Sequence, residues 1–473
     1  MIKSTIIFEN INSLLGDSSK INHLFLQSLS KINLLSVYQD SRCKYPRDSI
    51  IKLMILLKVL QAPSINALMH SQWASILQMG KDVFYKVKNS TTINWRKLLL
   101  SQAIQSNKEI EIDKDSNQVS EISCFIIDDS DIEKKGKCIE WIGRIFSHVN
   151  HNYKLGFKSL NLAYWSGKHL THIDFSYHIE LGKKKNQGMK SKDLKNRFSK
   201  DRAPNSPSAK RVAELVKKKT SCAISMIRRA MAGGLEASYI LADSWFFNSE
   251  LAQFTKSKKI HLISRPKFNN WKYTQNGRSY TIGKLILKMR RNKKVKWNRH
   301  LRKRFVKVGV QFKGMNLSIM YYNERKRGGR WQAIITTDNK LTAQKAYEIY
   351  QSRWAIENSY KELKQHLNYG KSMSRDFDGQ ISDATQSLMV YNTLSHLKAV
   401  EQHQSIGYLF KTISQQWLKP TMMQKFWKEF FKAIQEIADT LNKTVEELIY
   451  LIINKSEFFK QLNKLNAILT TET

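Results

Sequence analysis

The distribution of apolar and polar positions predicts a helical first part of the chain. Residues 48–60 form a nearly continuous apolar stretch, typical of a buried helix, with Asp48 as its N-cap. A second helix is expected at 64–77, capped by Ser64, and a short basic helix with aromatic residues at 81–89. A helix, a turn and a basic helix are compatible with a DNA-binding helix-turn-helix, and equally with a plain helical bundle.

A different pattern follows, in which short apolar runs end in acidic or turn-forming residues and predict buried strands. Strands are expected at 123–128, 238–243 and 260–266, a hairpin at 156–165 and 169–177, and helices at 206–234 and 248–257. The order is therefore strand, hairpin, helix, strand, helix, strand. This order predicts an α/β domain of ribonuclease-H-like layout, with an antiparallel hairpin beside parallel strands in one mixed sheet.

The rest of the chain divides around this core. Residues 267–337 read as an inserted β-rich subdomain, and a long helix from about Thr342 to His366 resumes the core. The predicted regions are 1–115 (helical, DNA-binding), 116–266 (catalytic core, first part), 267–337 (inserted basic β subdomain), 338–400 (core, second part) and 401–473 (helical). The amphipathic stretch 424–452 is expected to pack on the core or on a second copy of the chain.

Charge changes the picture from fold to partner. The 473 residues contain 79 Lys and Arg against 39 Asp and Glu, a net charge of +40. Residues 181–330 alone hold 40 basic and 7 acidic residues, concentrated in the runs 183–202 and 288–307. A chain that is 41% hydrophobic and 11% aromatic is not a disordered polycation. The excess charge predicts a polyanionic partner, with nucleic acid first, and disfavours an enzyme of small neutral metabolites.

Other classes of protein are excluded by composition. No apolar run reaches the roughly 18–20 residues that a membrane-spanning helix needs. The N-terminus lacks the apolar stretch of a signal peptide. Cys43, Cys124, Cys138 and Cys222 lie far apart with no C-x-x-C spacing, which disfavours a zinc site or a disulfide framework. A cytoplasmic, nucleoid-associated protein without a membrane partner is expected.

Acidic residues at strand ends are the first candidates for chemistry. Asp128 and Asp129 end one predicted strand and Asp243 ends another, with Asp131 and Glu133 close to the first pair. Carboxylates at the ends of buried strands are costly unless they are solvated, paired or bound to metal. Each one alone is better explained as a turn former. Together, in so basic a chain, they predict a metal-binding site.

The segment 350–364 carries a third carboxylate. On one helix, Tyr350, Arg353, Glu357 and Lys364 would fall within about 60° of arc along some 21 Å. Arg353 and Glu357 could simply form an i,i+4 ion pair on a solvated face. A phosphodiester chain would use all four, with the carboxylate holding a metal and the other three side chains gripping phosphates.

With this spacing the sequence resembles the bacterial insertion-sequence transposases of family four, a branch of the DDE transposases with a YREK signature. The stretches FIIDDS (125–130) and LADSWF (241–246) are similar to the family's segments around its first and second catalytic aspartates. The resemblance implies a catalytic and metal-binding triad of Asp129, Asp243 and Glu357, with Asp128 as the alternative first acid.

The resemblance also implies cofactors, partners and mechanism. Two Mg²⁺ ions, which Mn²⁺ can replace, would promote cleavage of double-stranded DNA at terminal inverted repeats and joining to target DNA through a hairpin intermediate. A homodimer on DNA is expected. The DNA-binding residues are predicted in the signature helix and the second basic run: Tyr350, Arg353, Lys361, Lys364, Arg290, Arg291, Lys294 and Trp297. Trp297, inside the basic run, is a candidate for stacking on a flipped base, with Trp271 and Trp331 as rivals. For any one of the three, core packing is the better explanation, and the resemblance singles out none of them.

Two other functions share most of these features. A metal-dependent nuclease of the same fold would hydrolyse DNA without joining it, and a decayed transposase would bind DNA without catalysis. All three predict salt-sensitive binding of nucleic acid. Joining of a pre-cleaved end to a second DNA separates the first function from the other two.

Overall fold

The computed structural model describes most of the chain between residues 45 and 400. The described residues are 45–60, 64–70, 79–112, 122–148, 150–180, 197–292, 294–324, 330–400, 405–415 and 435–441, with isolated positions at 24, 25, 27–29, 31, 32, 188, 189, 193, 195, 443, 444 and 447. Most of the predicted C-terminal region 401–473, including most of 424–452, lies outside them.

The first part of the chain is helical, as predicted. Its helices are α3 (Arg47–Val59), α4 (Ile65–Met69), α6 (Lys81–Lys88) and α7 (Trp95–Ile112). Helix α3 begins after Pro46, so Asp48 lies in its first turn and is not the N-cap. The Ser64 hydroxyl caps α4 by accepting from the Ala67 backbone N–H at 3.0 Å, as expected.

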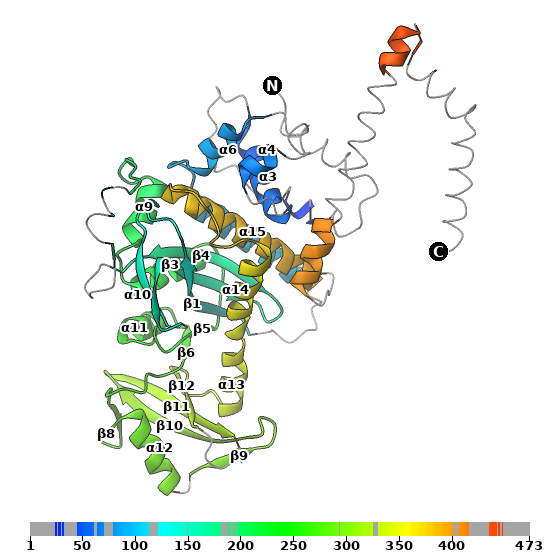
Figure 1. The fold of residues 1–473 in the computed structure, drawn as a ribbon. Coiled ribbons are helices and arrows are strands. Elements are labelled where there is room, and N and C mark those ends of the chain that lie inside the picture. The colour runs from blue at the N-terminus through cyan, green and yellow to red at the C-terminus, as the bar shows by residue number, and fades with distance from the viewer. Residues whose placement is uncertain are drawn as a thin grey trace, which may run out of the picture.

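A mixed sheet forms the centre of the molecule (Figure 1). Its core strands are β1 (Cys124–Glu133), β2 (Gly143–Ser147), β3 (Asn152–Trp165), β4 (Leu170–His178), β5 (Tyr239–Ala242) and β6 (His261–Ser264). Strand β3 pairs antiparallel with β1, β2 and β4, whereas β1, β5 and β6 run parallel. The predicted hairpin is β3–β4, and Gly167 provides the positive φ of 96° in its turn. The fold is therefore mixed α/β with an open mixed sheet, as predicted.

Each face of this sheet carries its own hydrophobic layer. On one face, called here the α14 face, residues such as Ile126 pack with Ile356 of α14 (Trp354–His366). On the opposite face, called the α10 face, Ile127 packs with Ile227 of α10 (Lys219–Ala232). Helices α9 (Pro207–Glu214) and α11 (Ser249–Ser257) complete the segment between β4 and β6. The predicted helix 206–234 is thus two helices, broken between α9 and α10.

The strands predicted between 267 and 337 are present and continue the same sheet. They are β7 (Tyr273–Gln275), β8 (Arg278–Tyr280), β9 (Lys296–Asn298), β10 (Lys303–Phe312), β11 (Met315–Glu324) and β12 (Gln332–Thr336). Strand β12 joins β6 through two residue pairs only, and these strands form a lobe of their own in Figure 1, called here the second lobe. It also contains an unpredicted helix, α12 (Ile282–Arg291).

The predicted long helix at 342–366 is instead two helices, α13 (Ala343–Gln351) and α14. At the break the backbone N–H groups of Ser352 and Arg353 donate to the carbonyls three residues back, so one tight turn replaces the α-helical ladder. The Ser352 hydroxyl also donates to the Ile349 carbonyl at 2.5 Å. The next helix, α15 (Phe377–Val400), is buried almost throughout its length and packs against α7 and α3.

Buried ion pairs join the helices to the sheet. The Asp174 carboxylate on β4 accepts from Arg96 at 2.9 Å and from Arg229 at 2.7 Å, and Arg211 lies 3.5 Å away. These three cations hold the pKa of Asp174 at about 2, although its burial alone would raise it. The network fixes α7, α9 and α10 against β4.

A second network changes the interpretation of the first basic run. Arg202 forms an ion pair with the buried Glu140 at 2.6 Å, and Lys200 lies 2.8 Å from Asp376 and 3.1 Å from Asp378. The run 183–202 contributes to the excess charge that predicts a nucleic-acid partner. Its last two basic residues instead neutralise buried acids, because the start of α15 would otherwise leave those carboxylates unpaired.

None of the described helices is both long and apolar enough to cross a membrane. Cys124, Cys138 and Cys222 are free thiols, and Cys43 lies outside the described part of the chain.

Candidate active site

Asp128 and Asp129 are neighbours on β1 and point to opposite faces of the sheet. Side chains alternate along a strand, and here Cys124 and Ile126 lie on the α14 face while Phe125 and Ile127 lie on the α10 face. Asp128 therefore points to the α14 face and Asp129 to the α10 face.

The Asp128 carboxylate faces the signature residues of α14. Arg353 Nη1 lies 3.9 Å from its Oδ2 atom, and only 13% of the Asp128 side chain is exposed. Burial raises the pKa of Asp128 to about 7; the nearby charges of Asp129 and Glu357 add to this rise, and Arg353 opposes it. A carboxyl group that titrates near neutrality beside a second carboxylate is typical of a functional site.

The Asp129 carboxylate has a different partner. It forms an ion pair with Lys219, at the start of α10, whose ammonium also lies 5.0 Å from the ring centre of Trp245. The two adjacent acids thus occupy two environments, and Asp129 is not the one facing Arg353.

Asp243 follows the end of β5 and lies next to Asp128, which stands in the middle of β1 because that strand runs beyond its predicted end to Glu133. In the β1–β5 ladder Ile127 is paired with Ala242, so the next residues, Asp128 and Asp243, extend the same register. Residues paired in this way project to the same face. The negative charge of Asp243 is also felt by Tyr350, whose hydroxyl donates to the Ala242 carbonyl at 3.4 Å.

The four signature residues lie around Asp128 and Asp243 and do not form one solvated stripe on a single helix. Tyr350 and Arg353 are buried, and Arg353 Nη2 lies 2.5 Å from Glu357 Oε1. Lys364 Nζ donates to Ser130 Oγ at 2.7 Å and to the Asp131 carbonyl at 3.2 Å. All four contact or face β1 or β5, although they come from two helices separated by a tight turn.

The other acids near the first site are paired with lysines of β3. Asp131 lies 2.9 Å from Lys158 Nζ, its direct cross-strand partner, and Glu133 lies 2.7 Å from Lys154 Nζ. These pairs neutralise two carboxylates that the sequence assigned to a crowded metal-binding site. They stabilise the pairing of β1 with β3.

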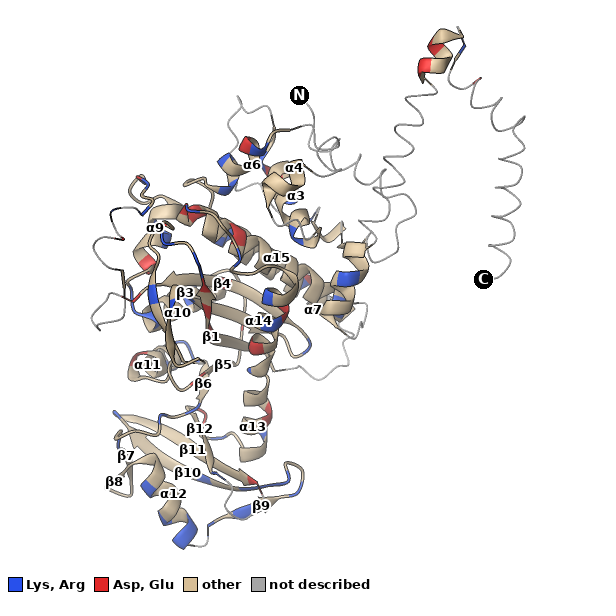
Figure 2. Ribbon diagram, in the orientation of Figure 1, with Lys and Arg blue, Asp and Glu red and all other residues tan. Residues whose placement is uncertain are grey.

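The predicted DNA-binding residues of the second basic run lie on the second lobe. Arg290 and Arg291 end α12, Lys294 follows it, and Trp297 lies on β9 with 43% of its surface exposed. Figure 2 shows this basic end of α12 at the tip of the lobe, beyond β10 and away from α14. Lys361 is exposed on α14 itself. The exposed cations of the second lobe therefore lie apart from the signature residues, whereas the exposed Lys361 shares α14 with Glu357 and Lys364.

One exposed aromatic residue near the acids was not selected from the sequence. Trp245 follows Asp243 by two residues and is 46% exposed, with the ammonium groups of Lys219 and Lys267 5.0 and 6.0 Å from its ring centre. Trp271 and Trp331, considered as stacking residues, pack partly buried against the core. Trp245 could have been selected from the sequence, because it lies in the LADSWF stretch two residues after the strand-end acid Asp243.

Asp128, Asp243 and Glu357 are the candidate ligands for a metal ion. Among the residues that the structure describes, no three His, Cys, Asp or Glu side chains are arranged to enclose one. The chemistry of the donors fits a divalent cation, because Asp128, Asp243 and Glu357 offer the oxygen ligands that Mg²⁺ prefers. Burial is the main cause of the raised pKa of Asp128, and a bound cation would favour the charged form of this buried carboxylate.

Comparison with known families agrees with this chemistry. Residues 220–393 match the family model "Transposase DDE domain", and residues 90–280 match "DDE superfamily endonuclease". No curated protein matches the chain significantly. The two matched segments include Asp128, Asp243 and Glu357. The chain therefore carries domains of the DDE transposase and endonuclease type, which supports a transposase-type function.

Proposed function

We propose that this protein is the transposase of an insertion sequence, of the YREK-signature branch, which cleaves DNA at the element's ends and joins them to target DNA. The proposal is carried by the register that sets Asp128, in the middle of β1, beside Asp243 just after β5, on the face where Arg353 lies between Asp128 and Glu357. The matched DDE-type domains support the same reaction class.

We assign the first catalytic acid to Asp128, in place of the sequence-based choice of Asp129. Asp128 faces Arg353 and feels the charge of Glu357, whereas Asp129 is neutralised by Lys219 on the other face. Asp128, Asp243 and Glu357 would hold divalent metal, which when bound activates water or a 3′-hydroxyl and stabilises the leaving oxygen in phosphoryl transfer.

The remaining residues of the site position these acids. Arg353 lies between Asp128 and Glu357 and keeps both charged groups oriented while the site is empty of DNA. Tyr350 donates a hydrogen bond to the Ala242 carbonyl at the end of β5, and Lys364 donates one to the Ser130 hydroxyl on β1. When DNA enters, these three side chains are the nearest donors for its terminal phosphates.

The exposed cations supply the grip on DNA away from the acids. Arg290, Arg291 and Lys294 at the tip of the second lobe would bind backbone phosphates, and Trp245 beside Asp243 would stack on an unpaired base. Two ends must be brought together for transposition, so a dimer assembled on DNA is part of the proposal, as is release of the element through a hairpin.

The decisive experiment uses the DNA that flanks the reading frame. Short inverted repeats bordered by direct repeats define the substrate, and duplexes carrying them are incubated with the protein and Mg²⁺. We expect cleavage at the repeat, and joining to a second DNA when a pre-cleaved 3′-hydroxyl end is supplied. Cleavage without any joined product would instead identify a nuclease.

Variants of the acids test the assignment within this reaction. Asp128→Asn, Asp243→Asn and Glu357→Gln should each abolish cleavage and joining, whereas Asp129→Asn should retain both. An inactive Asp129→Asn protein that binds DNA normally, together with an active Asp128→Asn protein, would restore the assignment made from the sequence.

A further inference from the structure

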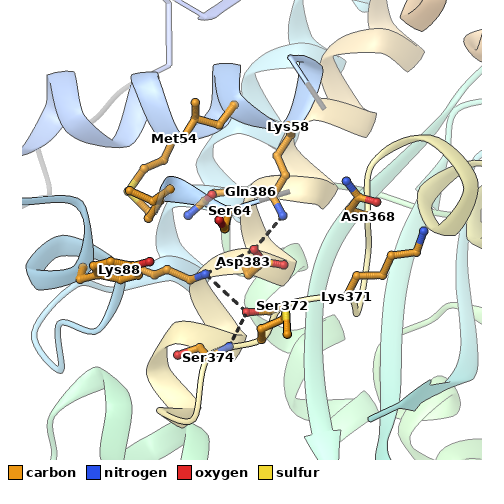
Figure 3. A pocket seen from close by; sticks show the side chains of 14 residues that line it. Met54, Lys58, Ser64, Lys88, Asn368, Lys371, Ser372, Ser374, Asp383 and Gln386 are labelled. Carbon is orange, nitrogen blue, oxygen red and sulfur yellow. Dashed lines mark hydrogen bonds and ion pairs between the residues drawn. The ribbon is translucent and has the colours of Figure 1, made fainter. Parts of the chain in front are cut away.

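A cavity lined by both polar and apolar residues lies beside the loop that connects α14 to α15. It has a volume of about 540 Å³ and is bounded by α3, α4 and α6 of the N-terminal region, by the loop 368–374 and by α15 (Figure 3). No residue of the proposed catalytic site lines it. The cavity therefore calls for a ligand of its own.

Two lysines that line this cavity, Lys58 and Lys88, form ion pairs with one carboxylate, and Lys134, which does not line the cavity, is close enough to be affected by its charge. Asp383 of α15 lies 2.8 Å from Lys58 Nζ and 3.6 Å from Lys88 Nζ. Lys134 lies behind the loop, where its Nζ donates to the carbonyls of Gly370 and Ser372 at 2.6 and 2.9 Å. One negative charge cannot balance three positive ones, so the cluster has a net charge of about +2 when all are ionised.

Burial and neighbouring lysines both disfavour the charged forms of Lys58 and Lys134. Burial lowers the pKa of Lys58, and it lowers the pKa of Lys134 to about 8; the other lysines of the cluster lower both further, and only Asp383 opposes this. Burial alone would raise the pKa of Asp383, but Lys58 and Lys88 hold it below its usual range. An added anion would stabilise all three ammonium groups at once.

The wall of the cavity offers the hydrogen-bonding groups that a tetrahedral oxyanion uses. Ser372 accepts from Lys88 Nζ at 3.4 Å, and Ser64 and Ser374 place further hydroxyls on the lining. The exposed Lys371 stands at the rim, where Figure 3 shows its side chain beside Asn368. Lysine ammonium groups with serine hydroxyls are a common phosphate-binding combination.

We propose that this cavity binds a phosphate group, and that the phosphate belongs to the backbone of the DNA strand held by the N-terminal helices. The identity of the DNA rests on the proposed function, whereas the phosphate chemistry rests on Lys58, Lys88, Lys134 and the serines alone. A phosphodiester here would tie α6 to the loop after α14, and so link DNA binding by the N-terminal region to the position of the signature helix.

The first arm of the test measures ionic contacts with DNA. Binding of a short mixed-sequence duplex is titrated with salt for the wild type, Lys88→Gln and Lys371→Gln, because the log–log slope counts neutralised phosphates at about 0.9 per contact. We expect a slope smaller by about one for Lys88→Gln. Lys340→Gln, which removes one exposed charge on the loop after β12, should leave the slope unchanged. Lys371→Gln lies at the exposed rim and keeps the test valid if the half-buried Lys88 variant folds poorly.

The second arm uses inorganic phosphate as the probe, in thermal unfolding at ionic strength matched with chloride. We expect phosphate to raise the midpoint of the wild type and of Lys340→Gln, and to lose this effect in Lys88→Gln. A phosphate effect with unchanged DNA slopes would overturn the DNA strand as the source and leave a site for free phosphate. Absence of both effects would overturn the inference completely. If the wild type bound no DNA while phosphate still acted through Lys88, the proposed function would fail separately from the phosphate site.

Discussion

The titration of Asp128 allows a quantitative test of the candidate site without any DNA. Its pKa rises from an ordinary 3.8 to about 7 in the folded protein, mainly through burial. The folded state therefore binds this proton more tightly than the unfolded state, and the group lowers stability as pH rises from about 4 to about 7. One pKa unit corresponds to about 1.4 kcal/mol, so the total is about 4 kcal/mol, with a level region above pH 7.

Replacement by asparagine removes this titration. The stability of Asp128→Asn relative to wild type should rise by about 1.4 kcal/mol per pH unit between pH 4 and pH 7 and then stay constant. Urea unfolding followed by tryptophan fluorescence, in buffers with EDTA, measures the difference at several pH values. The neighbouring Asp129→Asn variant is the matched control, because its carboxylate is a third exposed and paired with Lys219, and its effect should stay within about 1 kcal/mol.

The same pair of variants reports on divalent cations. Mg²⁺ added near pH 8 should stabilise the wild type and Asp129→Asn more than Asp128→Asn, since only the last lacks the buried carboxylate. A stability difference between Asp128→Asn and wild type that does not vary with pH would refute the reasoning, because it would place Asp128 in a solvated environment.

Three further variants test other parts of the structure. Asp174→Asn leaves Arg96, Arg211 and Arg229 facing a neutral group and should cost about 3–5 kcal/mol of unfolding free energy at pH 7. Because the pKa of Asp174 is lowered from 3.8 to about 2, the wild type should lose about 2.5 kcal/mol of stability as pH falls from about 4 to below 2. A loss below about 1 kcal/mol for Asp174→Asn at pH 7 in urea unfolding would contradict the network. Gly156→Ala would drive a Cβ atom into the Ile132 carbonyl oxygen on β1 and should destabilise the protein by about 3 kcal/mol, measured by thermal unfolding, whereas Gly309→Ala meets open space and should be nearly neutral. Trp245→Ala should weaken binding of a DNA end with unpaired bases by about 1–3 kcal/mol in a fluorescence titration, and Trp245→Phe should keep part of that affinity; equal affinity of all three proteins would remove Trp245 from the DNA interface.

Much of the core was predictable from local pattern. The start of β1, strand β5 before Asp243 and the β3–β4 hairpin are short apolar runs, and such runs depend little on distant contacts. The predicted end of the first strand at Asp128 was wrong, because β1 continues to Glu133 in its pairing with β3. Helix α12 was not predicted, although its buried apolar residues follow helical spacing: Ile282, Leu285, Ile286 and Met289. The basic residues at its end were interpreted as part of the charge run 288–307 and not as the last turn of a helix.

The choice between Asp128 and Asp129 could not be made from the pattern. Cys124, Phe125, Ile126 and Ile127 are all buried, so β1 shows no apolar and polar alternation that would tell its two faces apart. Only the tertiary partners, Arg353 on one face and Lys219 on the other, separate the two acids. The turn that divides α13 from α14 was likewise hidden, since no glycine or proline marks it.

The cross-strand pairing of Asp131 with Lys158 bears on how the protein responds to small insertions and deletions. Because both faces of β1 between 124 and 127 accept apolar residues, loss of one residue there would leave the hydrophobic layers filled. The charged second half of the strand would stay aligned with β3 through Asp131 and Lys158. The acids lie on the aligned side of such a deletion, so it would spare Asp128. A deletion of Ser130, between Asp129 and Asp131, would instead exchange the faces to which Asp128 and Asp129 point. We expect such a protein to lose activity without unfolding.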